Sequence, residues 1–96
     1  MKLKKTDVDF FLLQWIENDR MLRRVLCQYD MNLLVDRIVK GKSLRRIAEK
    51  REVSIGVIHL GLETILVSIE EKVSEEAAKR LRAIDLRLRV KSSPFI

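Results

Sequence analysis

The chain has 96 residues, of which 47% are hydrophobic and 35% charged, and its formal net charge is +6. This length suits one folded domain with its own core, and the composition argues against wholesale disorder. A single cysteine, Cys27, excludes an intramolecular disulfide and indicates a reducing compartment. Because Cys27 follows Val25-Leu26 in an apolar run, we expect it to be a small buried side chain.

The first residues combine basic and apolar side chains, but the pattern is not that of a signal peptide. Asp7 and Asp9 interrupt the run, and the apolar stretch 10–16 is too short. No segment of the sequence has the apolar length needed to cross a bilayer. We therefore expect a cytoplasmic protein with no targeting segment and no membrane association.

The positive charge is concentrated in two blocks. Residues 1–36 are balanced, whereas 37–51 carry seven basic groups against Glu49. Residues 52–76 carry six glutamates against Lys72, and 77–91 carry six basic groups against Asp85. A basic block is either a phosphate-facing surface or a solvated face, and sequence alone leaves both readings open.

Residues 6–40 are expected to form N-terminal helices. Thr6 can cap the first, with Asp7 and Asp9 in its opening turn, and Asn18-Asp19 is a plausible break. The buried stripe of this helix is Val8, Phe11, Leu12, Trp15 and Ile16. A second stripe is Met21, Val25, Leu26 and Tyr29.

A third helix is expected to begin after Asp30 and to stop at Gly41, which suits a left-handed C-terminal position. Its inner face is predicted to be Met31, Leu34, Val35, Ile38 and Val39.

Three serines predict the starts of the remaining helices. Ser43 caps a short helix to about Arg51, and Ser54 caps a longer one to about Val73, so a helix-turn-helix is expected over 43–73. The inward residues of the longer helix are Ile58, Leu62, Ile65 and Ile69. Ser74 starts a final basic segment, 75–91, whose inner face is Ala77, Leu81, Ile84 and Leu88.

The end of this last segment is ambiguous because 86–91 also alternates like a strand, although we favour a helix. The tail 92–96 is expected to be irregular. The predicted fold is therefore a single all-α domain over 1–96, a compact bundle of about five helices.

The residues needed for common catalytic and metal sites are missing. One histidine and one cysteine cannot form a four-ligand zinc site, and no glycine-rich phosphate loop occurs. The adjacent glutamates 70–71 and 75–76 are typical of solvated helix surfaces. We expect no catalytic residue, no metal and no cofactor, and hence no enzyme.

The stretch 41–65 has the pattern of a helix-turn-helix. Ile47 supplies a core contact, and Ala48 is the small residue that two crossing helices need. Val53 is expected to fill the pocket under the turn, while Ser54 caps the second helix. The residues that carry the pattern are Gly41, Lys42, Ser43, Ile47, Ala48, Glu49, Val53, Ser54, Ile58, Leu62 and Ile65.

This third of the chain resembles the LuxR-type C-terminal helix-turn-helix and the related region four of sigma factors. The resemblance implies DNA binding and transcriptional control, with 55–63 as the recognition helix. Two positions depart from the family pattern, because Arg51 stands where leucine is usually buried and Glu52 replaces the usual turn glycine. Arg51 could lay its stem over the core, and Glu52 would have to accept the turn geometry at some cost if that position needs a positive φ.

The candidate interface has two parts. The expected phosphate-binding residues are Lys40, Lys42, Arg45, Arg46, Lys50 and Arg51. The expected recognition-helix residues are Ser54, Ile55, Gly56, His59, Leu60 and Glu63. This second group lacks the Arg, Lys, Asn or Gln that read base edges, and a mostly apolar helix is more often buried than inserted in DNA.

Two functions follow from these patterns. The first is a small regulator that binds double-stranded DNA as a homodimer. The alternative is a protein-interaction module that presents Ile55 and Leu60 to a partner, such as a protein of the transcription machinery; RNA binding and a purely structural role are lesser alternatives. The segment 57–90 has more apolar residues than one buried stripe per helix requires, and this excess predicts self-association. The surplus residues are Val57, Leu60, Leu66, Val67 and Leu86.

Overall fold

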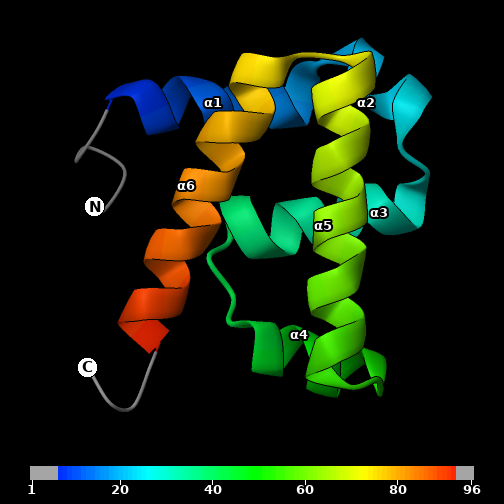
Figure 1. Cartoon of the computed structure of the whole chain (residues 1–96), viewed down its shortest axis with the longest axis vertical. Helices are drawn as coiled ribbons and strands as arrows, with labels where there is room; N and C mark the ends of the chain where they lie inside the picture. Colours follow the sequence, from blue (N-terminus) through cyan, green and yellow to red (C-terminus); the bar gives the residue numbers. More distant parts are fainter. Residues whose placement is uncertain (1–6, 93–96) are drawn as a thin grey trace.

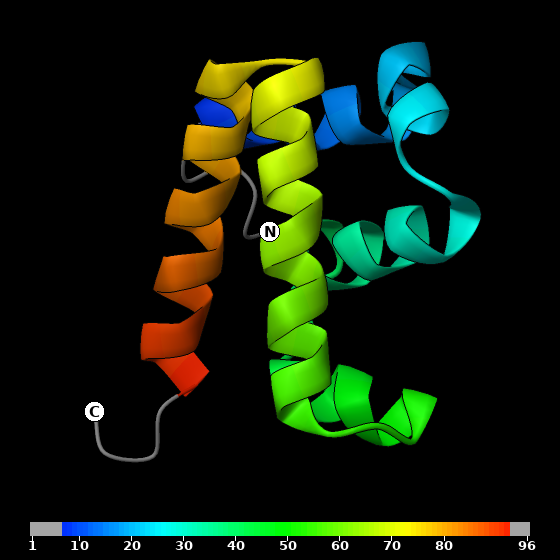
Figure 2. The same cartoon turned by 45° about the vertical axis from the view of Figure 1, so that its right-hand side comes forward.

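The helices form two layers (Figures 1 and 2). The computed structural model describes residues 7–92, with side chains from Leu12 to Arg89. The back layer is α1 (Asp7–Asn18), α2 (Arg20–Val25), α3 (Gln28–Leu34), the π-helical turn η2 (Val35–Val39) and α4 (Leu44–Arg51). The front layer is α5 (Ile55–Lys72) and α6 (Glu75–Ser92). The shortest dimension, 19 Å, is the thickness of two helices packed face to face. The predicted all-α bundle is confirmed, and the described residues contain no strand.

Helix α1 buries the predicted face and one residue more. Ile16 is fully buried and Leu12 nearly so, but Leu13, which lies beside the predicted stripe, is buried as well. The predicted cap Thr6 and the side chains of Val8 and Phe11 lie outside the described residues.

The second predicted stripe is wrong at Met21 and Tyr29, whereas Leu26 is buried and Val25 partly buried as predicted. Helix α2 ends at Val25, and an extended connection through Leu26 and Cys27 leads to α3. Helical spacing therefore does not continue across this break, and Met21 and Tyr29 are exposed, while Leu22 is fully buried. Cys27 is also exposed, contrary to expectation, since it lies in the connection rather than on an inward helix face.

Helix α3 starts earlier than predicted, after Cys27 instead of Asp30, and continues as η2. In this turn the Lys40 N–H donates to the Val35 carbonyl at 2.9 Å, one residue farther back than in an α-helix. The segment then stops at Gly41, whose φ of +69° is the left-handed conformation predicted for it. On the inner face Met31, Leu34 and Ile38 are buried and Val35 and Val39 partly so.

Both helices of the 43–73 segment begin where the sequence predicts. The Ser43 hydroxyl accepts a hydrogen bond from the Arg46 N–H at 3.1 Å, and that of Ser54 accepts one from the Val57 N–H at 3.2 Å. Between them Glu52 has φ 59° and ψ 44°, the left-handed region anticipated for this turn. Val53 does not fill a pocket under the turn: its side chain is exposed, because the turn lifts it away from the core.

Helices α5 and α6 form an antiparallel hairpin. The Ser74 hydroxyl accepts a hydrogen bond from the Ala77 N–H at 3.1 Å, as predicted for the start of α6. The predicted inward residues of both helices are buried, except that Leu88 is only partly so, and Leu66, predicted to be surplus, is buried too. Gly61 lets α5 approach α3, since a Cβ there would lie 3.4 Å from Leu33 Cδ2. The segment 86–91 is helical, and residues 93–96 of the predicted tail lie outside the described residues.

The packing of Ala48 yields a first test. Ala48 is 2% exposed on α4, which packs against α5 and η2. Ala48→Leu should lower the free energy of unfolding by about 1–3 kcal/mol, because the extra methylene groups have no space. Urea unfolding measures the loss. Glu49→Leu, at the exposed neighbouring position, is the control, and equal stability of the two variants would contradict this packing.

A second test uses the left-handed turn. Glu52→Gly should raise the free energy of unfolding by up to about 1 kcal/mol, because glycine adopts φ near +59° without steric cost. The same change at Glu49, inside α4, should instead lower it by about 1 kcal/mol. Thermal unfolding of the two variants should therefore shift in opposite directions, and a shared direction would argue against this turn.

Candidate nucleic-acid interface

The outward face of α4 carries unpaired positive charge. Arg45, Arg46 and Lys50 are exposed, and none forms an ion pair with another described residue. The inward face holds Ile47 and Ala48 in the core, so helical spacing directs the three cations to solvent. These are the candidate phosphate-binding residues that the structure leaves available.

Lys40 and Lys42, just before α4, share one carboxylate. The Asp36 Oδ1 atom lies 3.8 Å from Lys40 Nζ and 3.7 Å from Lys42 Nζ. Lys42 is only a quarter exposed, whereas Lys40 reaches into solvent. Their combined charge is therefore partly compensated, and their contribution to an anion-binding surface is smaller than the sequence indicates.

Arg51 is engaged within the protein. Its guanidinium carbon lies 4.1 Å from the centroid of the Tyr29 ring, and Nη2 donates to the Tyr29 carbonyl at 3.4 Å. A cation stacked on a tyrosine face in this way ties the end of α4 to α3. Arg51 thus has an internal role at the position where the families named above usually bury leucine, and it is a poor phosphate ligand.

The start of α5 exposes apolar and small residues. Ser54, Ile55, Gly56 and Leu60 all face solvent, and Leu60 is 68% exposed. A Cβ added at Gly56 would meet only the Ser54 hydroxyl, at 3.8 Å, so no packing within the protein requires a glycine there. These residues lie where a recognition helix would present them, but they offer no side chain that reads base edges.

Two of the predicted recognition residues contact α6. Arg89 Nη2 lies 2.8 Å from His59 Nδ1, and because arginine can only donate, Nδ1 accepts and Nε2 carries the histidine proton. Arg82 reaches Glu63 at 3.6 Å and Glu70 at 3.0 Å. His59 and Glu63 are therefore neighbours of α6 rather than free ends of a recognition surface.

A buried ion pair lies behind these contacts. Arg37 is 1% exposed, and its Nε donates to Asp85 Oδ1 at 2.7 Å. Its Nη1 donates to the Lys42 carbonyl at 2.9 Å, and its Nη2 to the Asp85 carbonyl at 3.3 Å. The second oxygen of Asp85 lies 2.8 Å from Arg89 Nη2. A continuous polar chain thus runs from η2 through α6 to His59 on α5.

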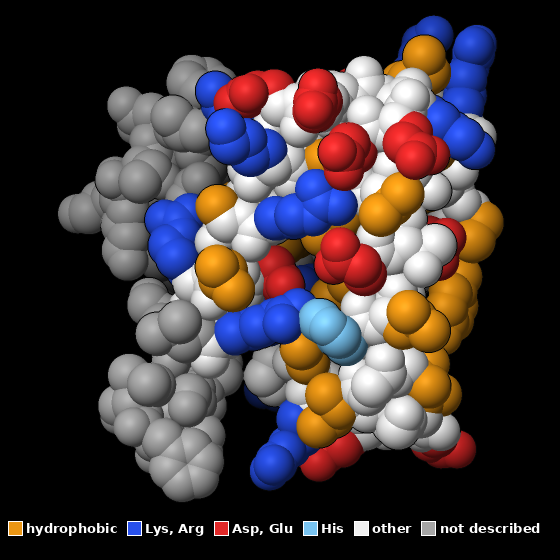
Figure 3. Space-filling view, viewed as in Figure 1, with side chains coloured by type: hydrophobic (Ala, Val, Ile, Leu, Met, Phe, Trp, Pro, Cys, Tyr) orange, Lys and Arg blue, Asp and Glu red, His pale blue; other side chains and the backbone are white. Residues whose placement is uncertain are grey.

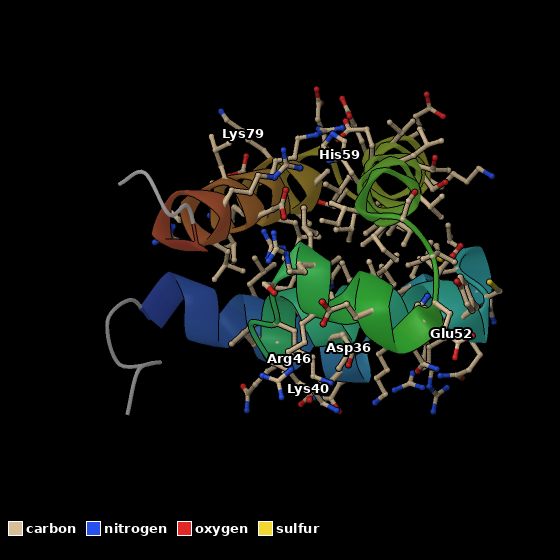
Figure 4. The ribbon with its side chains drawn as sticks, turned by 90° about the horizontal axis from the view of Figure 1, so that it is seen from below. Asp36, Lys40, Arg46, Glu52, His59 and Lys79 are labelled. Atoms are coloured by element: carbon tan, nitrogen blue, oxygen red, sulfur yellow. The ribbon has the colours of Figure 1, made fainter. Side chains whose placement is uncertain are left out.

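The predicted site residues do not share one face. Seen from the α4 end, Lys40 and Arg46 lie on one side of the molecule, whereas His59 and Lys79 lie on the opposite side with α5 and α6 (Figure 4). The structure therefore separates the phosphate-binding candidates from His59. The residues that the sequence assigns to one interface therefore do not all lie on one surface.

Other kinds of site find little support in residues 7–92. No group of three or more His, Cys, Asp or Glu side chains is placed to hold a metal ion there. Within the same range no single helix is long and apolar enough to cross a membrane; α4 and α5 reach that criterion only as a pair bent by 107°. An open hollow of about 460 Å³ lies between α1, α2 and the start of α6, at the opposite end from α4 (Figure 1).

Comparisons with protein-family models, with curated proteins and with solved structures find no match for this chain. The resemblance to LuxR-type and sigma-factor helix-turn-helices therefore stays a prediction from the sequence pattern.

Sequence reasoning missed the buried pair of Arg37 and Asp85. Both were counted only as members of charged blocks, although each has a signal in its spacing. Arg37 follows Leu33 by four residues, and Asp85 follows Leu81 by four, so each continues a buried face. An ionisable residue at such a position needs a partner, and opposite charges on two inward faces indicate one another.

The buried pair gives a third test. Asp85→Ala should lower the free energy of unfolding by about 3–5 kcal/mol, because it leaves the buried Arg37 charge without its partner. Combining Asp85→Leu with Arg37→Leu should cost less than Asp85→Ala alone, since no buried charge remains. Asp36→Ala, which removes more exposed ion pairs at 3.7–3.8 Å, is the control and should cost less than about 1 kcal/mol. Urea unfolding that ranks Asp36→Ala as the costlier change would refute this assignment.

Proposed function

We propose that the protein binds double-stranded DNA through phosphate contacts made by α4, as a small DNA-binding regulator. The observation that carries the proposal is the outward face of α4, where Arg45, Arg46 and Lys50 are exposed and form no ion pair with another described residue. Long cationic side chains on one helix face suit a phosphate backbone, from which they release condensed counterions.

The geometry of α4 and α5 supports the same proposal. The two helices are bent by 107° and joined by the three residues 52–54. Helix-turn-helix motifs combine an angle of about 90–120° with a turn of three or four residues. The buried Ala48, the left-handed Glu52 and the capping Ser54 agree with the roles that the sequence pattern gives them.

The proposed contact has little sequence preference. The exposed part of α5 offers Ile55, Gly56 and Leu60, while His59 and Glu63 contact α6. The three glutamates of α5 also repel the phosphates of DNA, which disfavours insertion of this helix in a groove. Phosphate contacts position a protein on DNA without specifying bases, so α4 is expected to supply affinity and little specificity.

A salt titration tests the proposal. Each phosphate contact contributes about −0.9 to the slope of log affinity against log salt, so Arg45→Ala with Arg46→Ala should flatten that slope by up to about 2. Fluorescence anisotropy with a duplex of arbitrary sequence at several salt concentrations measures it.

The control for this titration removes the same charge from the other face. Arg80→Ala with Arg87→Ala, on α6, should leave the slope within about half a unit of the unmodified protein. If the α6 changes flatten the slope and the α4 changes do not, the basic part of α6 is the DNA-binding surface and the present assignment fails.

A second candidate function is supported by the exposed apolar part of α5. Ile55, Val57 and Leu60 are 44%, 51% and 68% exposed. Exposed apolar side chains with a charged rim are typical of protein interfaces, and a protein of the transcription machinery is one candidate partner. In that case Leu60→Ala abolishes partner binding, and the α4 arginine changes alter mainly the association rate.

A further inference from the structure

The front layer has an outward face that no other part of the described chain covers. Opposite the buried residues of α5, helical spacing places Leu60, Thr64, Val67 and Glu71, all of them exposed. Opposite the buried residues of α6 it places Lys79, Ala83 and Leu86, also exposed. Figure 3 shows hydrophobic side chains over both helices of this face, separated by charged ones.

The two halves of this face carry opposite charge. The charged residue of this face on α5 is Glu71, and the one on α6 is Lys79. Glu71 and Lys79 are both exposed and form no ion pair with another described residue. A copy of the same face, rotated so that α5 meets α6, therefore brings unlike charges together, whereas α5 on α5 would bring like charges together.

The apolar side chains of the two helices also lie at matching heights, where height is the distance along the helix from the turn that joins α5 and α6. Leu60 lies twelve residues before the end of α5 at Lys72, and Leu86 lies eleven after the start of α6 at Glu75. At 1.5 Å per residue, both are about 17–18 Å from the turn that joins the helices. The observed contact of His59 with Arg89 shows that neighbouring residues of α5 and α6 do lie at equal distances from the turn.

We propose that this α5–α6 face is the interface of a homodimer. Its two-fold axis runs between α5 and α6 and parallel to them. Rotation about such an axis leaves each residue of the second copy at the same height as in the first. Leu60 then packs against Leu86 of the second copy, and Leu86 against its Leu60, as the self-complementarity of a two-fold interface requires. Glu71 lies within about 5 Å in height of Lys79 of the second copy, so these two groups can pair.

The proposal goes beyond DNA binding and does not depend on it. Lys40 and Arg46 lie on the opposite side from His59 and Lys79 (Figure 4), so the α4 surface stays accessible in the dimer. The interface is tested without DNA, and a monomer that binds DNA would overturn the dimer alone.

Sedimentation equilibrium at tens of micromolar is the first experiment. The protein should have twice the 11.3 kDa mass of one chain. Leu60→Glu and Leu86→Glu should each raise the dissociation constant of the dimer at least about tenfold, because each replaces an apolar contact across the interface with a charge. Met21→Glu, at a residue that is 47% exposed outside this face, is the matched control and should change it less than about twofold.

A charge exchange tests the arrangement of the helices. Lys79→Glu alone and Glu71→Lys alone should each weaken the dimer, and the two changes together should restore it. Thermal unfolding of every variant checks the fold, and these exposed positions should leave stability within about 0.5 kcal/mol. A monomeric mass for the unmodified protein overturns the proposal. So does a dimer that Leu86→Glu leaves unchanged, or one that the charge exchange fails to restore.

Discussion

The Arg37 side chain lies between η2 and α6, and the residue is only 1% exposed. Its guanidinium donates hydrogen bonds to both the carboxylate and the carbonyl of Asp85. The same side chain binds the Lys42 carbonyl in the connection to α4. Asp85 in turn holds Arg89, which contacts His59 on α5. One buried charge thus fixes the back layer, the start of α4 and the front layer relative to one another.

This buried ion pair contributes more to the relative orientation of the helices than to the free energy of unfolding. Removing two charges from water costs about as much as their attraction returns, and apolar residues of similar volume would pack as well. What an apolar replacement lacks is direction, because Arg37 binds groups on two segments at fixed angles. The connection 40–43 therefore leaves η2 along a defined path, and α4 presents Arg46 on the side away from α6 (Figure 4).

The parts of the fold that local chemistry decides were predictable from the sequence. Ser43, Ser54 and Ser74 each cap the helix assigned to them, and Gly41 and Glu52 both have positive φ. The errors lie where tertiary packing or a change of direction decides. Met21 was placed inward by a spacing that the break after Val25 interrupts, and Cys27 by its position in an apolar run.

The candidate site was predicted less well than the fold, for the same reason. Exposure of the α4 cations follows from helical spacing, whereas the stacking of Arg51 on Tyr29 joins residues that are 22 positions apart. The link between His59 and Arg89 spans 30 positions. A count of charges along the chain contains no information on these pairings, so it could not show that the basic block is split between partners, the core and solvent.

The distance along the chain between Arg37 and Asp85, 48 residues, has a consequence for the order of assembly. During synthesis the back-layer helices emerge first, and they contain the arginine but not its carboxylate. Packing them tightly at that stage would enclose an uncompensated charge, so a compact intermediate without the last helix is disfavoured. The docking of α6 is therefore expected to coincide with closure of the core, which makes folding of this domain cooperative until α6 has been synthesised.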